Sequence, residues 1–528
     1  MSDTTEEESM KFEVLKAVAG DGPTARLGRL TLPTRPVLQT PNFLAITSRG
    51  VVPHLTPDTI TRHGSFSGAY MAMEDLVEKS QKNVTKIPAV AKMPCYDGKR
   101  LHAFTCLPAS VATILGPRRV PAVKAPIGNN DSSIQVFSSN GFQPLTNKAY
   151  IDLIATLKPD IAIPLADLAY SSTAASKKQG KGIVKMCERT EEWMEQLHKS
   201  LDSDELPASN TAIFAPTLPA PLPLQWHYLS RLSEDFLDKL SGLAVYDTSI
   251  LPELERYPPL LPLPRLTLDA PSTPHDILRQ ISLGVDVFLL PFVNAVSDAG
   301  VAMSFQFPPP SPSPKSSPND ASILTTTTSL SSSPPPPQTT TTTNSTELLP
   351  LGTDLTFPAN AASLDPLVPN CACHTCTAHH RAYIHHLLNA REMLAWTLLQ
   401  LHNHHTMAQF FSGVRASLAT SKAQFEQDCA LFFKTYEPEL PIGSGTRPRA
   451  RGYHFKSELG DEKRNVVTWQ LLQEGQQQAK TTQGKENFKA LQGKVARDEA
   501  DTPVVPGDDV DAAELVREGL GQVVIKSD

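Results

Sequence analysis

Three closely spaced cysteines, Cys371, Cys373 and Cys376, constrain the fold of this chain more than any other feature. With C-x-C-x2-C spacing, the three thiolates can bind one metal ion only if the chain forms a tight turn. The fold must then bring a distant histidine, with His402 as the leading candidate, to the ion as its fourth, tetrahedral ligand. Three sulfurs and one imidazole nitrogen form a zinc ligand set. Because four protein ligands leave no position for water or substrate, the pattern predicts one closed, structural Zn²⁺ rather than a hydrolytic centre.

Alternatives to this ligand set remain open on spacing alone. Several other histidines of the region compete for the fourth position: His374, His379, His380, His385, His386, His404 and His405. The three thiols also admit a redox role. Their spacing suits a disulfide poorly but suits metal binding well, which favours the metal site. We call Cys371, Cys373 and Cys376 with their histidine ligand the clip.

The composition is typical of a globular, reduced protein. The 528 residues, 40% of them apolar, can fill one large barrel or two ordinary domains. Cys95, Cys106, Cys187 and Cys429 are scattered without the spacing of a disulfide framework. We expect these four cysteines to be small buried apolar residues of an intracellular chain.

Targeting signals and a strongly basic surface are missing from the sequence. The first residues, MSDTTEEESMKF, are acidic and lack an apolar core, and no run reaches the length of a membrane span. The formal charge of −7 argues against broad nonspecific binding of nucleic acid, although it leaves room for a local basic face. We therefore expect a cytoplasmic protein.

From Phe12 to about Phe307, short apolar runs alternate with longer amphipathic stretches. The expected strands include 161–165, 212–215, 243–245 and 285–290, and the expected helices include 147–157 and 188–201. Strands that alternate with helices pair in parallel through crossovers. At this length the pattern favours an α/β fold of the (β/α)8 TIM-barrel type over an open doubly wound sheet.

The rest of the chain divides by composition. Residues 1–11 are predicted to be disordered, 12–307 to form the barrel, and 308–346, rich in Pro, Ser and Thr, to be a disordered insertion within the domain. Residues 347–440 should hold the zinc-binding segment and closing helices, with Leu394 on one apolar stripe and a second stripe from Met407 to Phe433. The polar tail, 441–528, is predicted to be mostly disordered.

The clip and its flanking helix resemble the zinc segment of the tRNA-guanine transglycosylases. In that family C-x-C-x2-C is followed by R-A-Y-[LI]-x-H-L, a glutamate, and a histidine within L-x-x-[LI]-H-N. Residues 371–405 read CACHTCTAHHRAYIHHLLNAREMLAWTLLQLHNHH, which matches each part. The resemblance selects His402 as the fourth ligand. It also implies a zinc-binding subdomain inserted in a TIM barrel, with a C-terminal helical region.

Shorter matches extend the resemblance over most of the chain that we expect to be ordered. RLGRLTL, TPNFLAITSRG and HLTPDTI are similar to the opening hairpin and first barrel strand of the family. LKPDIAIPLAD resembles the strand whose terminal aspartate, Asp167 here, contacts the exchanged base. SGLAVYD and GVDVF resemble two later strands, the second of which delivers the nucleophile.

The nucleophile itself is missing. Family enzymes attack the ribose C1′ with an aspartate that directly follows G-V-D-x-F, which forms a covalent RNA intermediate. Leu289 occupies this position, and Gly300 stands at the family's distance downstream, so the two patterns align without a gap. The family's D-S-G-G-F-Q is also missing, because FSSNGFQP at 137–144 falls in a later hairpin. The resemblance implies no catalytic residue, with Asp167 as a remnant of base binding.

A chain that keeps the scaffold and the clip without the nucleophile resembles the noncatalytic partner within this family. The resemblance implies a heterodimer with a catalytic subunit, one structural Zn²⁺ per subunit, and contact with tRNA through the complex. Such heterodimers replace guanine by queuine at the wobble position of tRNAs with GUN anticodons, those for Asp, Asn, His and Tyr. The family also implies a link with the mitochondrial outer surface, without a membrane span.

Two other hypotheses stay open. The chain could be a self-sufficient transglycosylase whose nucleophile is displaced to Asp286 or Asp298, although the side chain of Asp286 should point away from that of position 289. Alternatively, it could be a zinc-stabilised scaffold with no role on tRNA.

Overall fold

The fold is seen in a computed structural model, which describes residues 9–17, 24–77, 88–94, 100–123, 125, 128–138, 141–168, 179–202, 210–310 and 348–445. All of these residues belong to one compact unit, Met1–Phe455. Cys95, residues 1–8, most of the segment 308–346 and most of the tail 441–528 lie outside the described residues. The predictions made for them stay predictions.

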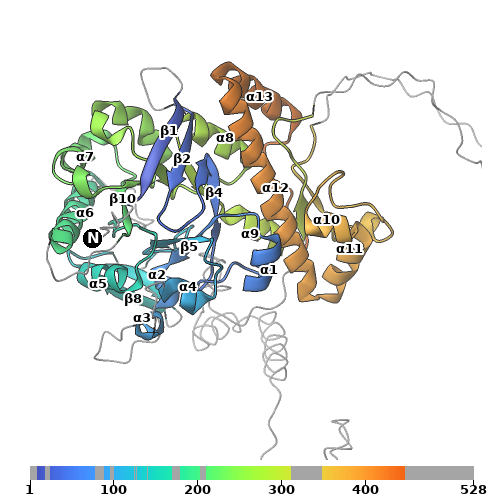
Figure 1. Cartoon of the computed structure of the whole chain (residues 1–528), viewed down its shortest axis with the longest axis horizontal. Coiled ribbons are helices and arrows are strands. Elements are labelled where there is room, and N and C mark those ends of the chain that lie inside the picture. Colours follow the sequence, from blue (N-terminus) through green and yellow to red (C-terminus); the bar gives the residue numbers. More distant parts are fainter. Residues whose placement is uncertain are drawn as a thin grey trace, which may run out of the picture. The chain divides into compact units, whose positions relative to one another are not determined.

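Eight parallel strands close into a barrel in the order β10-β11-β12-β13-β4-β5-β6-β9 (Figure 1). They are β4 (Asn42–Ile46), β5 (Gly68–Ala72), β6 (Ala112–Gly116), β9 (Ile161–Ala162), β10 (Ala212–Thr217), β11 (Gly242–Val245), β12 (Arg265–Thr267) and β13 (Val287–Leu289). The barrel closes where β13 pairs with β4 and Leu289 lies opposite Leu44. The predicted TIM barrel is confirmed, and an open sheet with two free edges is excluded.

Helices and short 3-10 turns connect the strands on the outside of the barrel. They are α1 (Pro57–His63), α2 (Met73–Leu76), α3 (Ala89–Lys92), α4 (Arg100–Thr105), α5 (Asn147–Leu157), α6 (Gln179–Asp202), α7 (Leu222–Glu234), η1 (Leu237–Lys239), η2 (Thr248–Arg256), η3 (Pro258–Leu260), α8 (Pro274–Ser282) and α9 (Pro291–Asp298). Within the described ranges, none of the helices has both the length and the apolar character needed to cross a membrane.

Two of the expected strands are shorter than predicted. The apolar run 161–165 contributes only β9 to the barrel, because its ladder stops after Ile163 donates to the carbonyl of Leu115 and Pro164 has no N–H to continue it. The run 285–290 contributes only β13. The remaining residues of both runs are still buried, so apolar character predicted their burial better than their pairing.

A small antiparallel sheet covers the N-terminal end of the barrel. It consists of β1 (Lys11–Ala17), β2 (Arg26–Thr31) and β3 (Leu38–Thr40). Leu30, Leu32 and Leu38 pack in the same apolar cluster as Leu289 of the barrel interior. A separate hairpin, β7 (Ser133–Ser138) and β8 (Gly141–Thr146), contains the FSSNGFQP segment, as predicted; Ser139 and Asn140 of its turn lie outside the described residues.

The C-terminal part packs against one side of the barrel. β14 (Val301–Met303) pairs with β15 (Gly352–Asp354), and η4 (Pro358–Asn360), α10 (His374–Ala378), α11 (Arg381–Ala390), α12 (Met393–Thr420) and α13 (Lys422–Thr435) follow. The long helix α12 lies between the barrel and the pair α10 and α11, and it contacts both (Figure 1). Ser421 ends α12 and caps α13 by accepting a hydrogen bond from the backbone of Gln424.

One residue of the predicted apolar stripes is misplaced. Leu394, expected in the core, is 43% exposed, and its neighbour Met393 is 65% exposed. The first turn of α12 extends beyond the packed region, which begins at Ala395 and Trp396. A helical repeat gives the face of a residue, but it does not show where along the helix the packing starts.

Candidate metal centre

The four predicted ligands converge in space. Cys371, Cys373 and Cys376 form a tight turn at the start of α10, and His402 enters from the middle of α12. One ligand atom from each residue lies within 4.8 Å of all the others. His402 Nδ1 is 3.8, 3.5 and 3.4 Å from the sulfurs of Cys371, Cys373 and Cys376. The group is deeply placed, since His402 is fully buried and only Cys371 is partly exposed.

The surrounding contacts orient the imidazole toward the sulfurs. His402 Nε2 lies 2.9 Å from the carbonyl of Met303 in β14, which can only accept, so Nε2 carries the proton and Nδ1 presents its lone pair. The backbone N–H of Cys376 donates to the sulfur of Cys373 at 3.3 Å. Thr375, between the cysteines, donates its hydroxyl to the carbonyl of Leu398 and so ties the turn to α12.

The thiols and the imidazole of the cluster shift one another's pKa values. Burial opposes protonation of His402, but hydrogen bonds and the negative charge of Cys371 and Cys376 outweigh it and raise the pKa of His402 to about 9. Hydrogen bonds from Cys373 and Cys376 hold the pKa of Cys371 below its ordinary value. Hydrogen bonds with Cys371 and Cys376 raise the pKa of Cys373 instead, so the negative charge of the cluster rests on Cys371 rather than on all three sulfurs. Three sulfurs and one nitrogen at this spacing fit a tetrahedral metal ion.

None of the competing histidines joins the cluster in the part of the chain that the structure describes. His404 is buried and its Nδ1 lies 2.9 Å from the carbonyl of Gln400, while His385 bonds the carbonyl of Leu355. His374 and His379 are half-buried, with His374 stacked on His63 and edge-on to His379. Among the described residues, only His402 brings a ring nitrogen into the group formed with the three cysteines.

Leu289 lies inside the barrel. Its side chain is fully buried, within an apolar cluster that also contains Leu44, Leu266 and Val287. The position that carries the nucleophile in the family pattern is thus occupied by a hydrocarbon in an apolar environment.

Asp286 lies at the N-terminal end of β13 and is fully buried. Both of its carboxylate oxygens accept from the guanidinium of Arg26, at 2.9 and 2.5 Å, and one also accepts the backbone N–H of Arg265. Active sites of TIM barrels lie at the opposite, C-terminal end of the strands. Asp286 is therefore a structural residue that joins β2 to the base of the barrel.

Asp298 lies outside the barrel at the end of α9. Its carboxylate is 2.6 Å from Nε2 of His54, and its carbonyl accepts from the indole of Trp396 in α12. These contacts join α9 to α12. Neither aspartate of the displaced-nucleophile hypothesis lies at the C-terminal end of the strands.

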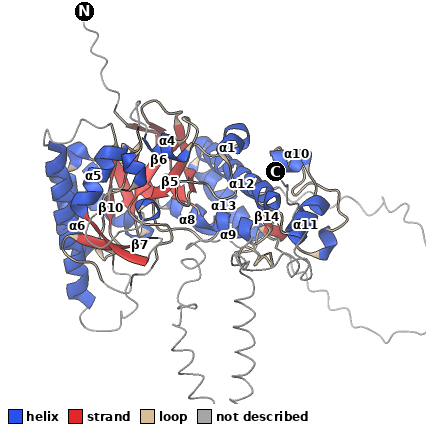
Figure 2. Cartoon of the chain, turned by 90° about the horizontal axis from the view of Figure 1, so that it is seen from below, coloured by secondary structure: helices blue, strands red, loops and turns tan. Residues whose placement is uncertain are grey.

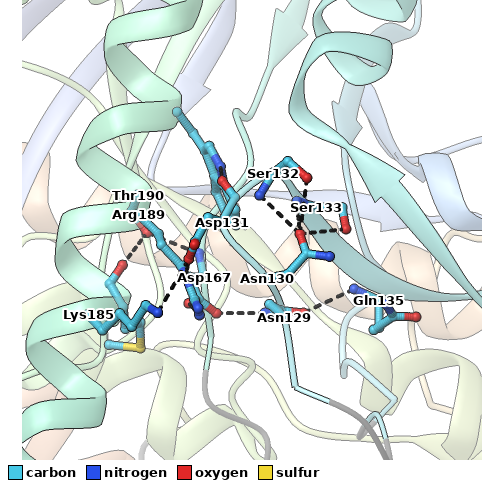
Figure 3. A network of polar contacts seen from close by, with 12 residues as sticks. Asn129, Asn130, Asp131, Ser132, Ser133, Gln135, Asp167, Lys185, Arg189 and Thr190 are labelled. Atoms are coloured by element: carbon cyan, nitrogen blue, oxygen red, sulfur yellow. Dashed lines mark hydrogen bonds and ion pairs between the residues drawn. The ribbon is translucent and has the colours of Figure 1, made fainter.

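Asp167 lies just beyond β9, at the C-terminal end of the barrel, and its carboxylate is already engaged (Figure 3). One oxygen accepts from Asn129 Nδ2 at 2.6 Å and the other from Arg189 at 3.0 Å, while its backbone N–H donates to Thr190. Arg189 also bonds Asp131, at 2.7 Å, so that it joins two carboxylates. The predicted remnant of base binding is held within a network of the protein's own side chains.

Sequence reasoning missed the partners of Asp167. Asn129 belongs to the run NNDSS, in which the side chain of Asn130 accepts hydrogen bonds from the backbone of Ser132 and Ser133. Asn, Asp and Ser are typical turn residues, so the sequence could have predicted a turn at this run. Arg189 lies on α6, far from Asp167 in sequence, and no motif marks it.

Comparisons with known proteins agree with this architecture. The family model described as queuine tRNA-ribosyltransferase matches residues 21–438. A Schizosaccharomyces pombe protein named queuine tRNA-ribosyltransferase accessory subunit 2 is 30% identical over 455 residues, which cover 84% of this chain and 89% of the relative. Proteins of the same name from Drosophila persimilis and Culex quinquefasciatus are 26% and 27% identical over 78% of this chain, and 89% and 88% of their own lengths are covered. The chain belongs to the queuine tRNA-ribosyltransferase family.

Proposed function

We propose that this chain is the noncatalytic subunit of a heterodimeric queuine tRNA-ribosyltransferase. In this proposal a catalytic homologue exchanges guanine for queuine at the wobble position of tRNAs with GUN anticodons, and this chain supports assembly and positions the tRNA. The relatives named accessory subunit 2 match along most of both chains, which supports the assignment. The same proposal puts the complex in the cytoplasm, with access to its tRNA substrates.

The buried side chain of Leu289 is the observation that carries the proposal. A leucine has no lone pair with which to attack the ribose C1′ and no charge to stabilise a positive anomeric carbon. Asp286 and Asp298, the two alternatives, are held in contacts away from the C-terminal end of the strands. Asp167 is bonded to Arg189 and Asn129, which argues against its use as a base-binding group in this subunit.

We further propose that the cysteine and histidine cluster binds one structural Zn²⁺. Cys371, Cys373, Cys376 and His402 would hold the ion, and its binding energy would join α10 to α12. With four protein ligands the ion offers no place for substrate. Its contribution is to the folded shape of the C-terminal part rather than to the chemistry.

The surface next to the cluster is a suitable pairing face. His379 stacks on Tyr383 of α11 with centroids 5.4 Å apart, and His374 stacks on His63 of α1 at 4.1 Å. These rings are only partly buried, and flat aromatic side chains are enriched at the centres of protein interfaces. Because His374 lies between two metal ligands in sequence, loss of the ion would also disturb this face.

Tyr383→Ala tests the pairing face. We expect the variant to keep its metal and thermal stability while its affinity for the catalytic homologue falls by at least about tenfold, the loss typical of an interface hot spot. Tyr257→Ala, a partly exposed tyrosine after η2, is the matched control and should pair normally. Analytical ultracentrifugation of the mixed subunits gives the affinities. Equal pairing by Tyr383→Ala and wild type would remove this face from the proposal.

Binding to tRNA separates the proposal from a scaffold without a tRNA role. Affinity should be measured for each chain and for the mixture over a salt series, because phosphate contacts appear in the salt dependence. We expect the mixture to bind GUN tRNA more tightly than the catalytic homologue alone. No change on adding this chain would favour the scaffold.

A further inference from the structure

A groove lies between α6 and α7, away from the metal centre. The two helices contact each other, and the space between their outer faces has a volume of about 420 Å³. Both views place α6 on the opposite side of the barrel from α10 and α11, so the groove is separate from the pairing face proposed above (Figures 1 and 2). Nothing in the site, or in the role proposed for it, uses this surface.

Four glutamates of α6 line one wall: Glu188, Glu191, Glu192 and Glu195. Their spacing of three, four and seven residues puts all four on one helical face. Like charges four residues apart on a helix destabilise it by a few tenths of a kcal/mol per pair, and this wall contains two such pairs. A cationic ligand would reduce the repulsion between these carboxylates, so the wall is suited to bind one.

Internal cations neutralise only two of the four carboxylates. Glu191 bonds His227 at 2.8 Å and Arg231 at 3.0 Å. Glu195 bonds Lys199 at 2.6 Å and also contacts Arg231, at 3.1 Å. Arg231 also bonds Asp235 at 2.9 Å, so this one guanidinium is shared among three carboxylates, and it is not among the residues that line the groove.

The other two carboxylates are not paired. Glu188 and Glu192 are exposed, and neither forms an ion pair with any described residue; Glu192 has only a 3.5 Å contact with the side-chain amide of Gln196. They stand four residues apart at the mouth of the groove. Two exposed carboxylates at this spacing can both reach one planar cation.

The opposite wall carries an exposed indole. Trp226 of α7 is 55% exposed, with its ring edge-on to His227 at 5.5 Å, and Leu224 of α7 also lines the groove. An indole face attracts a cation more strongly than the other aromatic rings do. A guanidinium fits this pair of walls better than an ammonium, because it stacks flat on the ring while its N–H groups reach carboxylates in two directions.

We propose that the α6–α7 groove docks an arginine-bearing segment of a partner protein. The charge of the groove selects against nucleic acid, whose phosphates the glutamates repel. The surface therefore adds a protein-binding role on the side away from the catalytic partner, and it does not depend on which enzyme that partner is. Arginine is preferred over lysine for the geometric reason given above.

Isothermal titration of the full-length chain with three peptides tests the proposal. The probes are a peptide of alternating arginine and glycine, the same peptide with lysine, and the same peptide with citrulline, which keeps the shape of arginine but lacks its charge. We expect measurable binding of the arginine peptide at physiological ionic strength, at least about tenfold weaker binding of the lysine peptide, and none of the citrulline peptide.

Variants locate the binding. The double variant Glu188→Gln/Glu192→Gln and the single variant Trp226→Ala should each weaken the arginine peptide by about tenfold or more. Glu253→Gln/Glu255→Gln, which removes two exposed carboxylates from η2, changes the net charge equally and should bind as wild type does. Thermal unfolding checks that all variants are folded. An equal loss in the control pair, no effect of Trp226→Ala, or equal binding of arginine and lysine peptides would overturn the proposal.

Discussion

Leu289 and Asp286 are three residues apart in the chain, yet they serve different parts of the barrel. Leu289 fills the apolar interior, while Asp286 anchors Arg26 at the N-terminal end. The Arg26–Asp286 ion pair is almost fully buried. Each residue supplies the counter-charge without which the other would be a buried, unpaired charge. Burial also lowers the pKa of the neighbouring Arg265 to about 10, a cost that the negative charge of Asp286 partly offsets.

Asp286→Asn should lower the free energy of unfolding by about 3–5 kcal/mol, because it leaves the guanidinium of Arg26 buried without a counter-charge. Chemical denaturation measures the loss. Glu13→Gln, which breaks the exposed Arg29–Glu13 contact of 3.9 Å, should cost less than about 1 kcal/mol. The folded Asp286→Asn chain should still support base exchange in the mixed complex. Loss of exchange with unchanged stability would instead identify Asp286 as a nucleophile.

The metal ligands give a second prediction for single residues. Cys373→Ser and His402→Ala should lower zinc content, thermal stability and pairing together, since structural zinc contributes an apparent free energy on the order of 10 kcal/mol in small domains. Zinc content by mass spectrometry and thermal unfolding give the two readouts. Cys187 and Cys429 are buried as expected, but Cys106 is exposed, so the expectation for it was wrong. Cys106→Ser, at this exposed thiol outside the cluster, should change neither. Full zinc content and stability in His402→Ala would show that the fourth ligand is another group.

Helix α12 is the element that joins the parts of the fold. It contributes His402 to the candidate metal site and packs on α9. It also crosses the backbone at Phe307 so closely that only glycine fits at position 413. A Cβ at Gly413 would come within 1.7 Å of the carbonyl oxygen of Phe307. The absence of a side chain at this one residue sets how near the helix can lie to the backbone at Phe307.

Gly413→Ala should therefore destabilise the chain by about 3 kcal/mol, since the helix must shift away from backbone that cannot yield. Gly182→Ala in α6 is the matched control, because a Cβ there would meet nothing within 4 Å. It should be neutral or stabilise by up to about 1 kcal/mol through helix propensity. Thermal and denaturant unfolding of both variants check the contrast. A neutral Gly413→Ala would mean that α12 tolerates a wider crossing.

Secondary elements were the part of the fold that the sequence predicted best. Alternation of apolar runs and amphipathic helices identified the barrel, and helix 147–157 has the predicted bounds. Strand lengths were less predictable, because Pro164 ends a ladder within a run that stays buried. The prediction that Leu394 is buried was wrong, because contacts with other elements, rather than the helical repeat, decide where a helix enters the core.

For the site, local spacing located the cysteines but not every partner. Contacts such as Arg189 with Asp167, or Arg26 with Asp286, join residues far apart in sequence, and no local pattern encodes them. The choice of His402 among several histidines came from resemblance. The physical reason for that choice is visible only in the structure, where the Met303 carbonyl orients the ring.

The whole molecule presents two surfaces of different chemistry on opposite sides of the barrel. The side of α10 and α11 carries stacked rings next to the cysteine and histidine cluster, and the side of α6 and α7 carries carboxylates and an exposed indole. Between them lies the barrel, whose apolar interior contains Leu289. This arrangement suits a subunit that acts through its contacts.

Incorporation of labelled queuine into GUN tRNA tests this account most directly. It should be measured for the purified chain, for the catalytic homologue, and for the two mixed. We expect no incorporation by this chain alone, and more incorporation by the mixture than by the homologue alone. Appreciable exchange by this chain alone, with a trapped covalent RNA adduct, would contradict it.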